Sequence, residues 1–151
     1  MALRIIESSD PAQTESLGAE LAAGLGDGDV VLIEGELGSG KTTLVRGAAR
    51  ALGVTDPVTS PTYSIGHRYR TEGLTVSHLD LHRLAGLDHE DPALLSDYLG
   101  PGRIAFVEWP PEGERELEGA SLRVRLSHRG GDRRRIEVGE RRDFSRGGGQ
   151  G

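Results

Sequence analysis

The stretch GELGSGKTT at residues 35–43 constrains this chain more than any other segment. It matches the pattern G-x-x-x-x-G-K-[ST], in which backbone N–H groups surround a di- or triphosphate, the lysine reaches the outer phosphates and the next hydroxyl binds Mg²⁺. A chain of this composition contains the pattern by chance roughly 0.003 times. The pattern therefore predicts a nucleotide-phosphate site centred on Lys41 and Thr42.

The sequence on both sides of this loop has the order that such a site requires. Residues 30–33 form an apolar run typical of a buried strand, and residues 42–52 contain few turn formers and precede Gly53, which predicts a helix. The order of strand, glycine-rich loop and helix supports the motif, and the helix directs its positive end at the anion. Lys41 is the one lysine among 18 basic residues, and arginine does not replace a compact ammonium between phosphates.

The composition excludes several classes of protein. The 151 residues suit one domain. Without a long apolar run or a signal-peptide pattern, we expect a cytoplasmic protein that has no membrane partner. The absence of cysteine excludes disulfides and cysteine-based metal sites. Residues 1–119 hold 9 basic and 20 acidic side chains, whereas residues 120–151 hold 9 basic and 4 acidic side chains. Such an acidic chain is not a general RNA binder; its basic end either contacts RNA or an acidic partner, or is a solvated strand edge and tail.

Local patterns predict the remaining elements. Asp10-Pro11 is typical of a capped helix start, which follows a short strand at residues 3–7. A second cap-plus-proline start predicts a short helix from Asp91 to about Leu99. Glycine-containing turns predict two hairpins, one of strands 63–69 and 74–79 and one of a half-buried antiparallel strand at 120–128 with residues 133–138. We thus expect one domain over residues 1–138 and a disordered Arg/Gly-rich tail over residues 139–151.

Two acidic residues end predicted strands and suit the chemistry of a phosphate site. Asp80 and Glu108 each follow an apolar run, and ligands of open α/β sheets bind at the carboxyl ends of strands. Glu108 can bind Mg²⁺ or orient water, and Asp80 can assist the metal. An exposed strand-end acid is the alternative for Glu108. His78, Asp80 and His82 share one strand face and allow a transition-metal site, although polar residues at a strand end explain them more simply.

The loop at residues 55–64 has hydroxyls around a proline, with Ser60 and Thr62 beside Pro61. Such a segment can act as a switch that senses Mg²⁺ or the γ-phosphate, and the alternative is an ordinary surface loop. Trp109, the one tryptophan, either packs beside the site or fills the edge of the core.

The chain resembles the bacterial TsaE family, the small ATPases of tRNA threonylcarbamoyladenosine biosynthesis. The resemblance covers nearly all of residues 1–138 and depends on four segments in a fixed order: GELGSGKTT at 35–43, SPTY at 60–63, HLDLHRL at 78–84 and VEWP at 107–110. It implies an α/β fold of the P-loop NTPase type, with a mixed β-sheet flanked by helices and a C-terminal β-hairpin. It also implies binding of ATP or ADP with Mg²⁺, slow hydrolysis, and action with TsaB- and TsaD-type partners on adenosine 37 of tRNA, with indirect or weak tRNA contact.

The resemblance also implies roles for individual residues. Residues 37–42 would hold the phosphates, Thr42 and Glu108 would bind Mg²⁺, and Lys41, Thr43, Asp80 and Glu108 would be catalytic. Trp109, Ser60 and Thr62 would serve partner coupling or switching, and the adenine would lie between residues 10–14 and the hairpin near residues 132–133. The nucleotide-binding set is then Asp10, Thr14, Leu37, Gly38, Ser39, Gly40, Lys41, Thr42, Thr43 and Arg133.

Two features depart from the family pattern, and two other functions stay open. His82 stands where the family more often has tyrosine, and the tail from residue 139 has no family role that we can assign. A small-molecule kinase is one alternative, because Asp80 and Arg83 could hold an acceptor hydroxyl, although no arginine-rich lid is evident. A nucleotide-gated binding module without turnover is the other, since gated binding and slow hydrolysis use the same residues.

Overall fold

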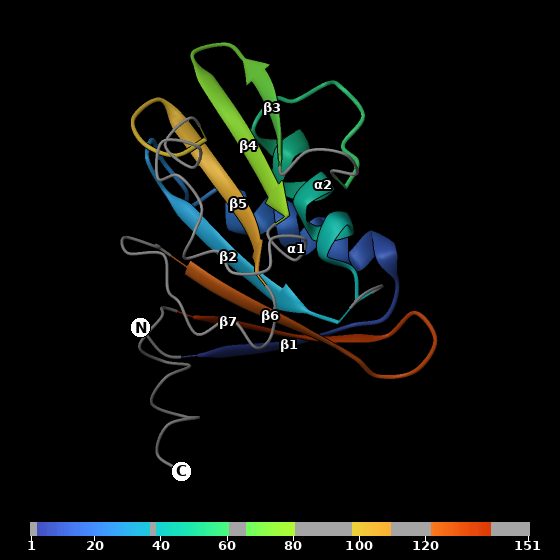
Figure 1. Cartoon of the computed structure of the whole chain (residues 1–151). Helices are drawn as coiled ribbons and strands as arrows, with labels where there is room; N and C mark the ends of the chain where they lie inside the picture. The colour runs from blue at the N-terminus through green and yellow to red at the C-terminus, as the bar shows by residue number, and fades with distance from the viewer. Residues whose placement is uncertain (1–2, 37–38, 61–65, 81–97, 110–121, 140–151) are drawn as a thin grey trace.

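The computed structural model describes residues 3–36, 39–60, 66–80, 98–109 and 122–139. They form a seven-stranded sheet with strand order β1-β7-β6-β2-β5-β4-β3, and two helices (Figure 1). The helices are α1 (Pro11–Ala22) and α2 (Lys41–Ala51). The strands are β1 (Arg4–Ser8), β2 (Val30–Gly35), β3 (Gly66–Thr71), β4 (Leu74–Asp80), β5 (Arg103–Trp109), β6 (Leu122–His128) and β7 (Arg134–Gly139).

The sheet is mixed, and its parallel strands lie in the middle. Strand β2 pairs in parallel with β5 and β6, and β5 pairs in parallel with β4. The antiparallel pairs lie toward the edges, where β3 joins β4, β6 joins β7 and β7 joins β1. Every residue of β2 is buried, which agrees with its central place in the sheet between β5 and β6.

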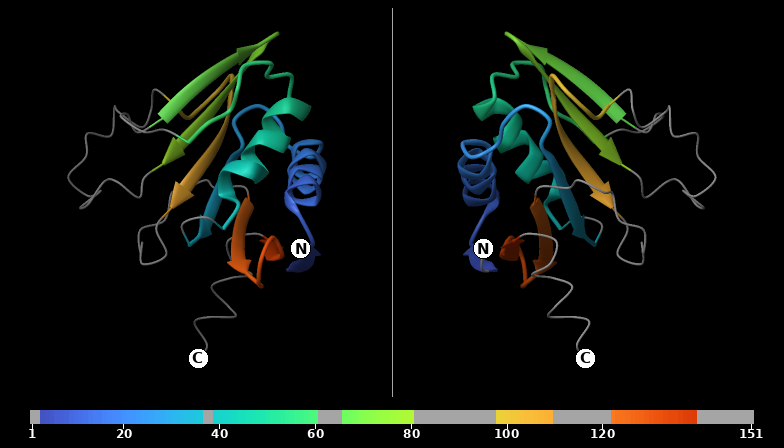
Figure 2. Two further views of the ribbon diagram at one scale, coloured as in Figure 1. Left: turned by 90° about the vertical axis from the view of Figure 1, so that its right-hand side faces the viewer. Right: turned by 90° about the vertical axis from the view of Figure 1, so that its left-hand side faces the viewer.

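Both helices cover the same face of the sheet (Figure 2). Side chains of α1 and α2 form one apolar core with the facing side chains of β2, β5 and β6, among them Val31, Ile33 and Phe106. The helices approach each other closely because glycines lie at their contact. A Cβ on Gly18 would lie 2.1 Å from the carbonyl oxygen of Leu44, and one on Gly47 would lie 2.0 Å from that of Glu15. The position of α1 against α2 thus depends on these two missing side chains.

The predicted fold class is confirmed, and most predicted elements occur within a few residues of their expected bounds. The capped start of α1 is confirmed, because the Asp10 carboxylate accepts a hydrogen bond from the backbone N–H of Gln13 at 2.9 Å. Residues 63–65, the predicted start of strand β3, lie outside the described residues; the strand continues into the expected turn, so Glu72 and Gly73 alone connect it to β4.

The prediction for the C-terminal hairpin was incomplete. Strand β6 is antiparallel to β7 as expected, but its other edge pairs in parallel with β2, which attaches the hairpin to the centre of the sheet. Strand β7 also continues through Gly139, one residue beyond the predicted end. The predicted tail beyond that residue, and nearly all of the predicted helix at 91–99, lie outside the described residues. Within the described ranges, neither helix has the length and apolar character needed to cross a membrane.

Candidate nucleotide-binding site

The predicted phosphate loop connects β2 to α2, as its sequence requires. Strand β2 ends at Gly35, and α2 begins at Lys41 after an N-cap at Gly40. Gly40 has a φ of 102°, in the left-handed region, where a side chain would strain the backbone. The N-terminus of α2 therefore lies at the carboxyl end of the central strand, and Thr42 and Thr43 belong to the first turn of the helix. Leu37 and Gly38, two predicted phosphate contacts, lie outside the described residues.

Lys41 is buried beneath this loop, with only 7% of its surface exposed. Its Nζ donates hydrogen bonds to the carbonyl oxygens of Gly35 at 2.8 Å and Glu36 at 3.0 Å. Burial lowers the pKa of Lys41, and the charges of Glu108, Asp80 and Glu36 partly oppose that shift. The ammonium therefore lies in a desolvated position where anionic groups interact with it strongly.

The two predicted acids meet at the same edge of the sheet. Asp80 ends β4 and stands opposite Glu108 of β5, and Glu108 stands opposite Ile33 of β2. Because β2, β4 and β5 are parallel, both acids lie at the carboxyl edge, where β2 enters the phosphate loop. Both are largely buried, with Asp80 9% and Glu108 3% exposed. The alternative prediction, that Glu108 is an exposed acid at the end of a strand, is thus wrong.

Glu108 has a partner that the sequence did not indicate. The Nε2 atom of His78 lies 2.6 Å from Oε2 of Glu108 in a buried hydrogen bond. His78 and Asp80 share a face of β4, as predicted, whereas His82 lies outside the described residues. In the ranges described here, no three His, Cys, Asp or Glu side chains group closely enough to hold a metal ion by themselves.

The oxygen donors at this edge fit Mg²⁺ rather than a transition metal. The Thr42 hydroxyl and the carboxylates of Asp80 and Glu108 are hard ligands, and Mg²⁺ typically takes one or two carboxylates together with phosphate oxygens. The residues also fit a phosphate group. The Ser39 hydroxyl is buried in the loop and has no hydrogen-bond partner among the described residues, and a buried polar group of this kind needs one.

The start of α1 contributes to the wall beside the loop. A Cβ on Gly40 would lie 3.9 Å from the Cγ2 methyl of Thr14, so Thr14 lies beside the phosphate loop, and its predicted contact with the nucleotide stays a prediction. The Thr14 hydroxyl exchanges a 2.8 Å hydrogen bond with Ser8, which joins α1 to β1. Asp10, also predicted to contact the nucleotide, is exposed and uses its carboxylate to cap α1.

The β6–β7 hairpin supplies the opposite wall through an arginine that was not predicted. Arg134 donates from Nε to the carbonyl oxygen of Ser39 at 3.0 Å, and from Nη1 to the carbonyl oxygens of Gly131 and Arg133. It continues the inward row of Ile136 and Val138 along β7, both of which are buried. This alternation was visible in the sequence and could have identified Arg134 as an arginine that reaches the loop.

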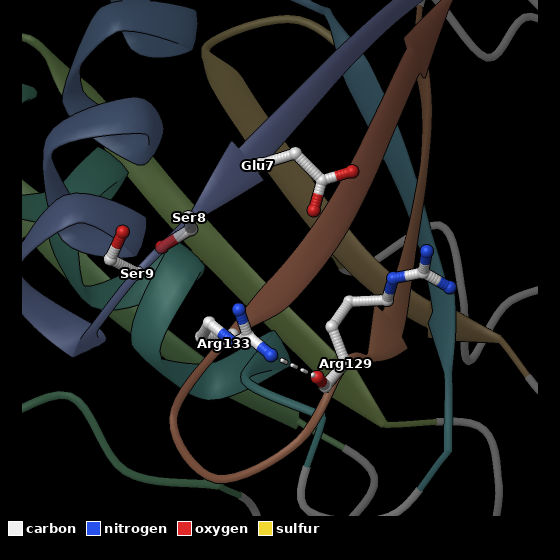
Figure 3. Close-up of a pocket in the computed structure, with 5 residues that line it drawn as sticks. All are labelled: Glu7, Ser8, Ser9, Arg129 and Arg133. Atoms are coloured by element: carbon white, nitrogen blue, oxygen red, sulfur yellow. Dashed lines mark hydrogen bonds between the residues drawn. The ribbon is translucent and has the colours of Figure 1, made fainter.

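Arg133 lies in a neighbouring cavity of about 450 Å³. Glu7, Ser8 and Ser9 line it from the junction of β1 and α1, and Arg129 and Arg133 line it from the hairpin (Figure 3). Arg133 donates to the carbonyl oxygen of Arg129 at 3.4 Å. The cavity includes Arg133 of the predicted adenine region, whereas its lining on the other side comes from residues 7–9, just before the predicted segment 10–14.

The start of the predicted switch loop is tied to the core. Arg46 of α2 donates to the carbonyl oxygen of Val58 at 3.3 Å, and the backbone N–H of Thr59 donates to the Tyr69 hydroxyl at 3.4 Å. Ser60 follows and is exposed. Thr62 and the side chain of Trp109 lie outside what the structure describes, so their predicted roles remain predictions.

Comparison with known proteins gave consistent matches. Residues 8–136 match the family model described as "Threonylcarbamoyl adenosine biosynthesis protein TsaE". The TsaE protein of Bacillus subtilis is 34% identical over 127 residues, which cover 84% of this chain and 79% of that protein. The TsaE protein of Streptomyces coelicolor is 41% identical over 118 residues, 77% of this chain and 80% of that one. The crystal structure of Bacillus subtilis YdiB superposes with a TM-score of 0.66 at 29% identity, and covers 90% of this chain and 84% of that one.

Proposed function

This chain belongs to the TsaE family of threonylcarbamoyl adenosine biosynthesis proteins, and from that premise we propose that it is a Mg²⁺-dependent ATPase serving this tRNA modification. One observation carries the proposal. The buried Lys41 ammonium lies under the N-terminus of α2 and interacts electrostatically with Glu108 and Asp80 at the same sheet edge. A phosphate cradle and a pair of acids for a metal are therefore adjacent.

In the proposed function, the loop and Lys41 bind the β- and γ-phosphates of ATP. Phosphate oxygens would take the hydrogen bonds that Lys41 now gives to Gly35 and Glu36, and would supply the partner that the buried Ser39 hydroxyl lacks among the described residues. The positive end of α2 adds to this attraction. Because the ammonium is already buried, little further desolvation is needed when the anion binds.

The metal would be held by the Thr42 hydroxyl and by the carboxylate of Glu108, with Asp80 beside it. Mg²⁺ supplies positive charge that offsets the charge of the transferring phosphoryl group. The acids themselves have two tasks in this site: they hold the metal side of the nucleotide, and they accept a hydrogen bond from a water placed for attack. Thr43, in the same helical turn as Thr42, is the remaining proposed catalytic residue.

The adenosine end would occupy the cavity between the β1–α1 junction and the hairpin. Thr14 and Arg134 border the phosphate loop from these two segments, and the cavity lined by Ser8, Ser9 and Arg133 continues away from it.

Hydrolysis in this proposal supports a complex with TsaB- and TsaD-type subunits, which would act on the tRNA. Ser60, Thr62 and Trp109 are the proposed switch and coupling residues. Contact of this chain with tRNA would be indirect or weak, because 20 of its acidic residues lie in positions 1–119 against 9 basic ones.

The test is phosphate release from Mg·ATP, measured for the protein alone and after addition of purified TsaB- and TsaD-type subunits. We expect slow release that rises when the subunits are present. Tight ATP binding without release in either condition would instead indicate a nucleotide-gated binding module. Release that requires an added small-molecule acceptor, with the phosphate recovered on that acceptor, would indicate a kinase.

Two variants separate the proposed roles. Lys41→Ala is expected to abolish tight ATP binding, because it removes the charge that meets the outer phosphates. Glu108→Ala is expected to keep nucleotide binding in EDTA, to gain less affinity from Mg²⁺, and to lose turnover, since this acid serves the metal and the water. Unchanged affinity in the first variant, or normal turnover in the second, would remove that residue from the proposed site.

A further inference from the structure

A histidine and a glutamate form a buried pair at the carboxyl edge of the sheet. His78 is fully buried, the Glu108 side chain is 4% exposed, and their Nε2 and Oε2 atoms are 2.6 Å apart. They come from different strands, β4 and β5, and are separated by 30 positions in the chain. Because water does not reach a pair buried this deeply, the two groups must satisfy each other.

The register explains why these two side chains meet. His78 stands opposite Phe106, and Asp80 stands opposite Glu108, so all four side chains point to the helix-covered face. His78 contacts Glu108 diagonally across the two parallel strands, because Glu108 lies two residues beyond Phe106, the residue opposite His78. Because His78 precedes Asp80 by two positions in β4, it contacts Glu108 from the interior side and leaves the carboxyl edge open.

The hydrogen bond fixes which atoms take part. Because an ionised carboxylate only accepts hydrogen bonds, Nε2 of the imidazole is the donor in this pair. In the described part of the chain Nδ1 is buried and has no partner. His78 therefore makes one polar contact there, and that contact is with Oε2 of Glu108, the carboxylate whose second oxygen is Oε1.

We propose that His78 is a positioning residue that holds Oε2 of Glu108 and thereby presents Oε1 to the Mg·nucleotide. This inference rests on the proposed function, because it assigns Glu108 to the metal side of the nucleotide. Hydrogen bonds behind a ligating carboxylate fix its orientation, and their loss typically lowers metal affinity or activity by about 10- to 100-fold.

The competing explanation is that His78 only fills the core beneath the sheet edge. A core-filling role predicts lower stability in every variant but no specific change in the use of Mg²⁺. The two explanations therefore separate in one quantity, the ratio of ADP affinity measured with Mg²⁺ to ADP affinity measured in EDTA.

The experiment measures this ratio with a fluorescent ADP analogue for the full-length protein and three variants. In His78→Leu we expect the ratio to fall about tenfold, while affinity in EDTA stays within twofold of wild type. His78→Gln should recover most of the ratio, because its side-chain amide nitrogen can donate from nearly the position of Nε2. His67→Leu is the matched control. His67 lies on β3 opposite His78 of β4, and its ring centroid is 5.9 Å from that of Tyr69.

The outcomes distinguish the inference from the proposed function. A wild-type protein whose ADP affinity does not depend on Mg²⁺ contradicts the proposed function and removes the inference with it. A wild type that depends on Mg²⁺, with an unchanged ratio in His78→Leu, contradicts the inference alone. Equal loss of the ratio in the Leu and Gln variants also overturns it, because a restored hydrogen-bond donor would then make no difference, and loss of thermal stability without any change in the ratio indicates core filling.

A measurement on the wild-type protein keeps the inference testable if His78→Leu does not fold. Nitrogen NMR of the five histidines, with His78 assigned by the signal missing in His78→Gln, should show the proton on Nε2. Addition of Mg·ADP should shift the His78 Nε2 signal more than ADP in EDTA does. Identical His78 signals in the two conditions would contradict a contact with the metal side of the site.

Discussion

The contact between the two helices yields a sharp prediction for Gly47→Ala. A Cβ at this position would lie 2.0 Å from the carbonyl oxygen of Glu15, 2.6 Å from its carbonyl carbon and 2.8 Å from its Cα. All three atoms belong to the backbone of α1, so no side-chain rotation relieves the overlap. The new methyl group must instead push α1 away from α2.

The size of the effect follows from these distances. Ordinary contact begins near 3.4 Å, so the helices must separate locally by roughly 1.4 Å, and overpacking of this kind typically costs about 1–3 kcal/mol. Alanine regains about 1 kcal/mol through its better helix propensity. Because the opposing atoms are rigid backbone, we expect the upper part of the range to apply and the net loss in free energy of unfolding to be about 2 kcal/mol. For a chain of this length that lowers Tm by roughly 4–8 °C.

Urea denaturation of the nucleotide-free protein measures this loss, and Gly24→Ala provides the matched control. Gly24 follows α1, and a Cβ there would meet nothing closer than the carbonyl oxygen of Leu21 at 3.8 Å. The control should therefore keep or slightly raise stability, by about 0.4–1 kcal/mol. A Gly47→Ala protein as stable as Gly24→Ala would refute the close backbone contact and the placement of α1 that depends on it.

Two further predictions concern the charged residues of the site. Burial lowers the folded-state pKa of Lys41. Below that pKa the buried, protonated Lys41 therefore lowers the free energy of unfolding. This destabilisation disappears as the pH rises past the unfolded-state pKa of about 10.4. Denaturation of nucleotide-free Lys41→Met at pH 7 should thus show an equal or higher free energy of unfolding, and a fall of more than about 1 kcal/mol would contradict this balance. Arg134→Gln should weaken ADP binding about tenfold, or about 1.4 kcal/mol, because Arg134 joins the hairpin to Ser39. Arg135→Gln, which loses only a surface pair with Glu7, should bind ADP as wild type does, and equal affinities in the two arginine variants would exclude Arg134 from the site.

Local sequence determined the parts of this protein that short patterns encode. The phosphate loop with its flanking strand and helix, the Asp10 cap and the acids that end β4 and β5 were all predicted, because each depends on residues within a few positions of one another. The inward alternation along β7 was also present in the sequence. It would have indicated Arg134 as a neighbour of the phosphate loop, had the inner face of that strand been known.

Only the tertiary structure decided which of these pieces meet. The parallel pairing of β6 with β2 brings Arg134 to the phosphate loop, and the register of β4 with β5 places His78 behind Glu108. The glycines at positions 18 and 47 look like weak points of two helices until the opposing backbones are seen 2.0–2.1 Å from their missing Cβ atoms. Such contacts join residues far apart in the chain, and their energy depends on strand order and helix placement, which no local periodicity specifies.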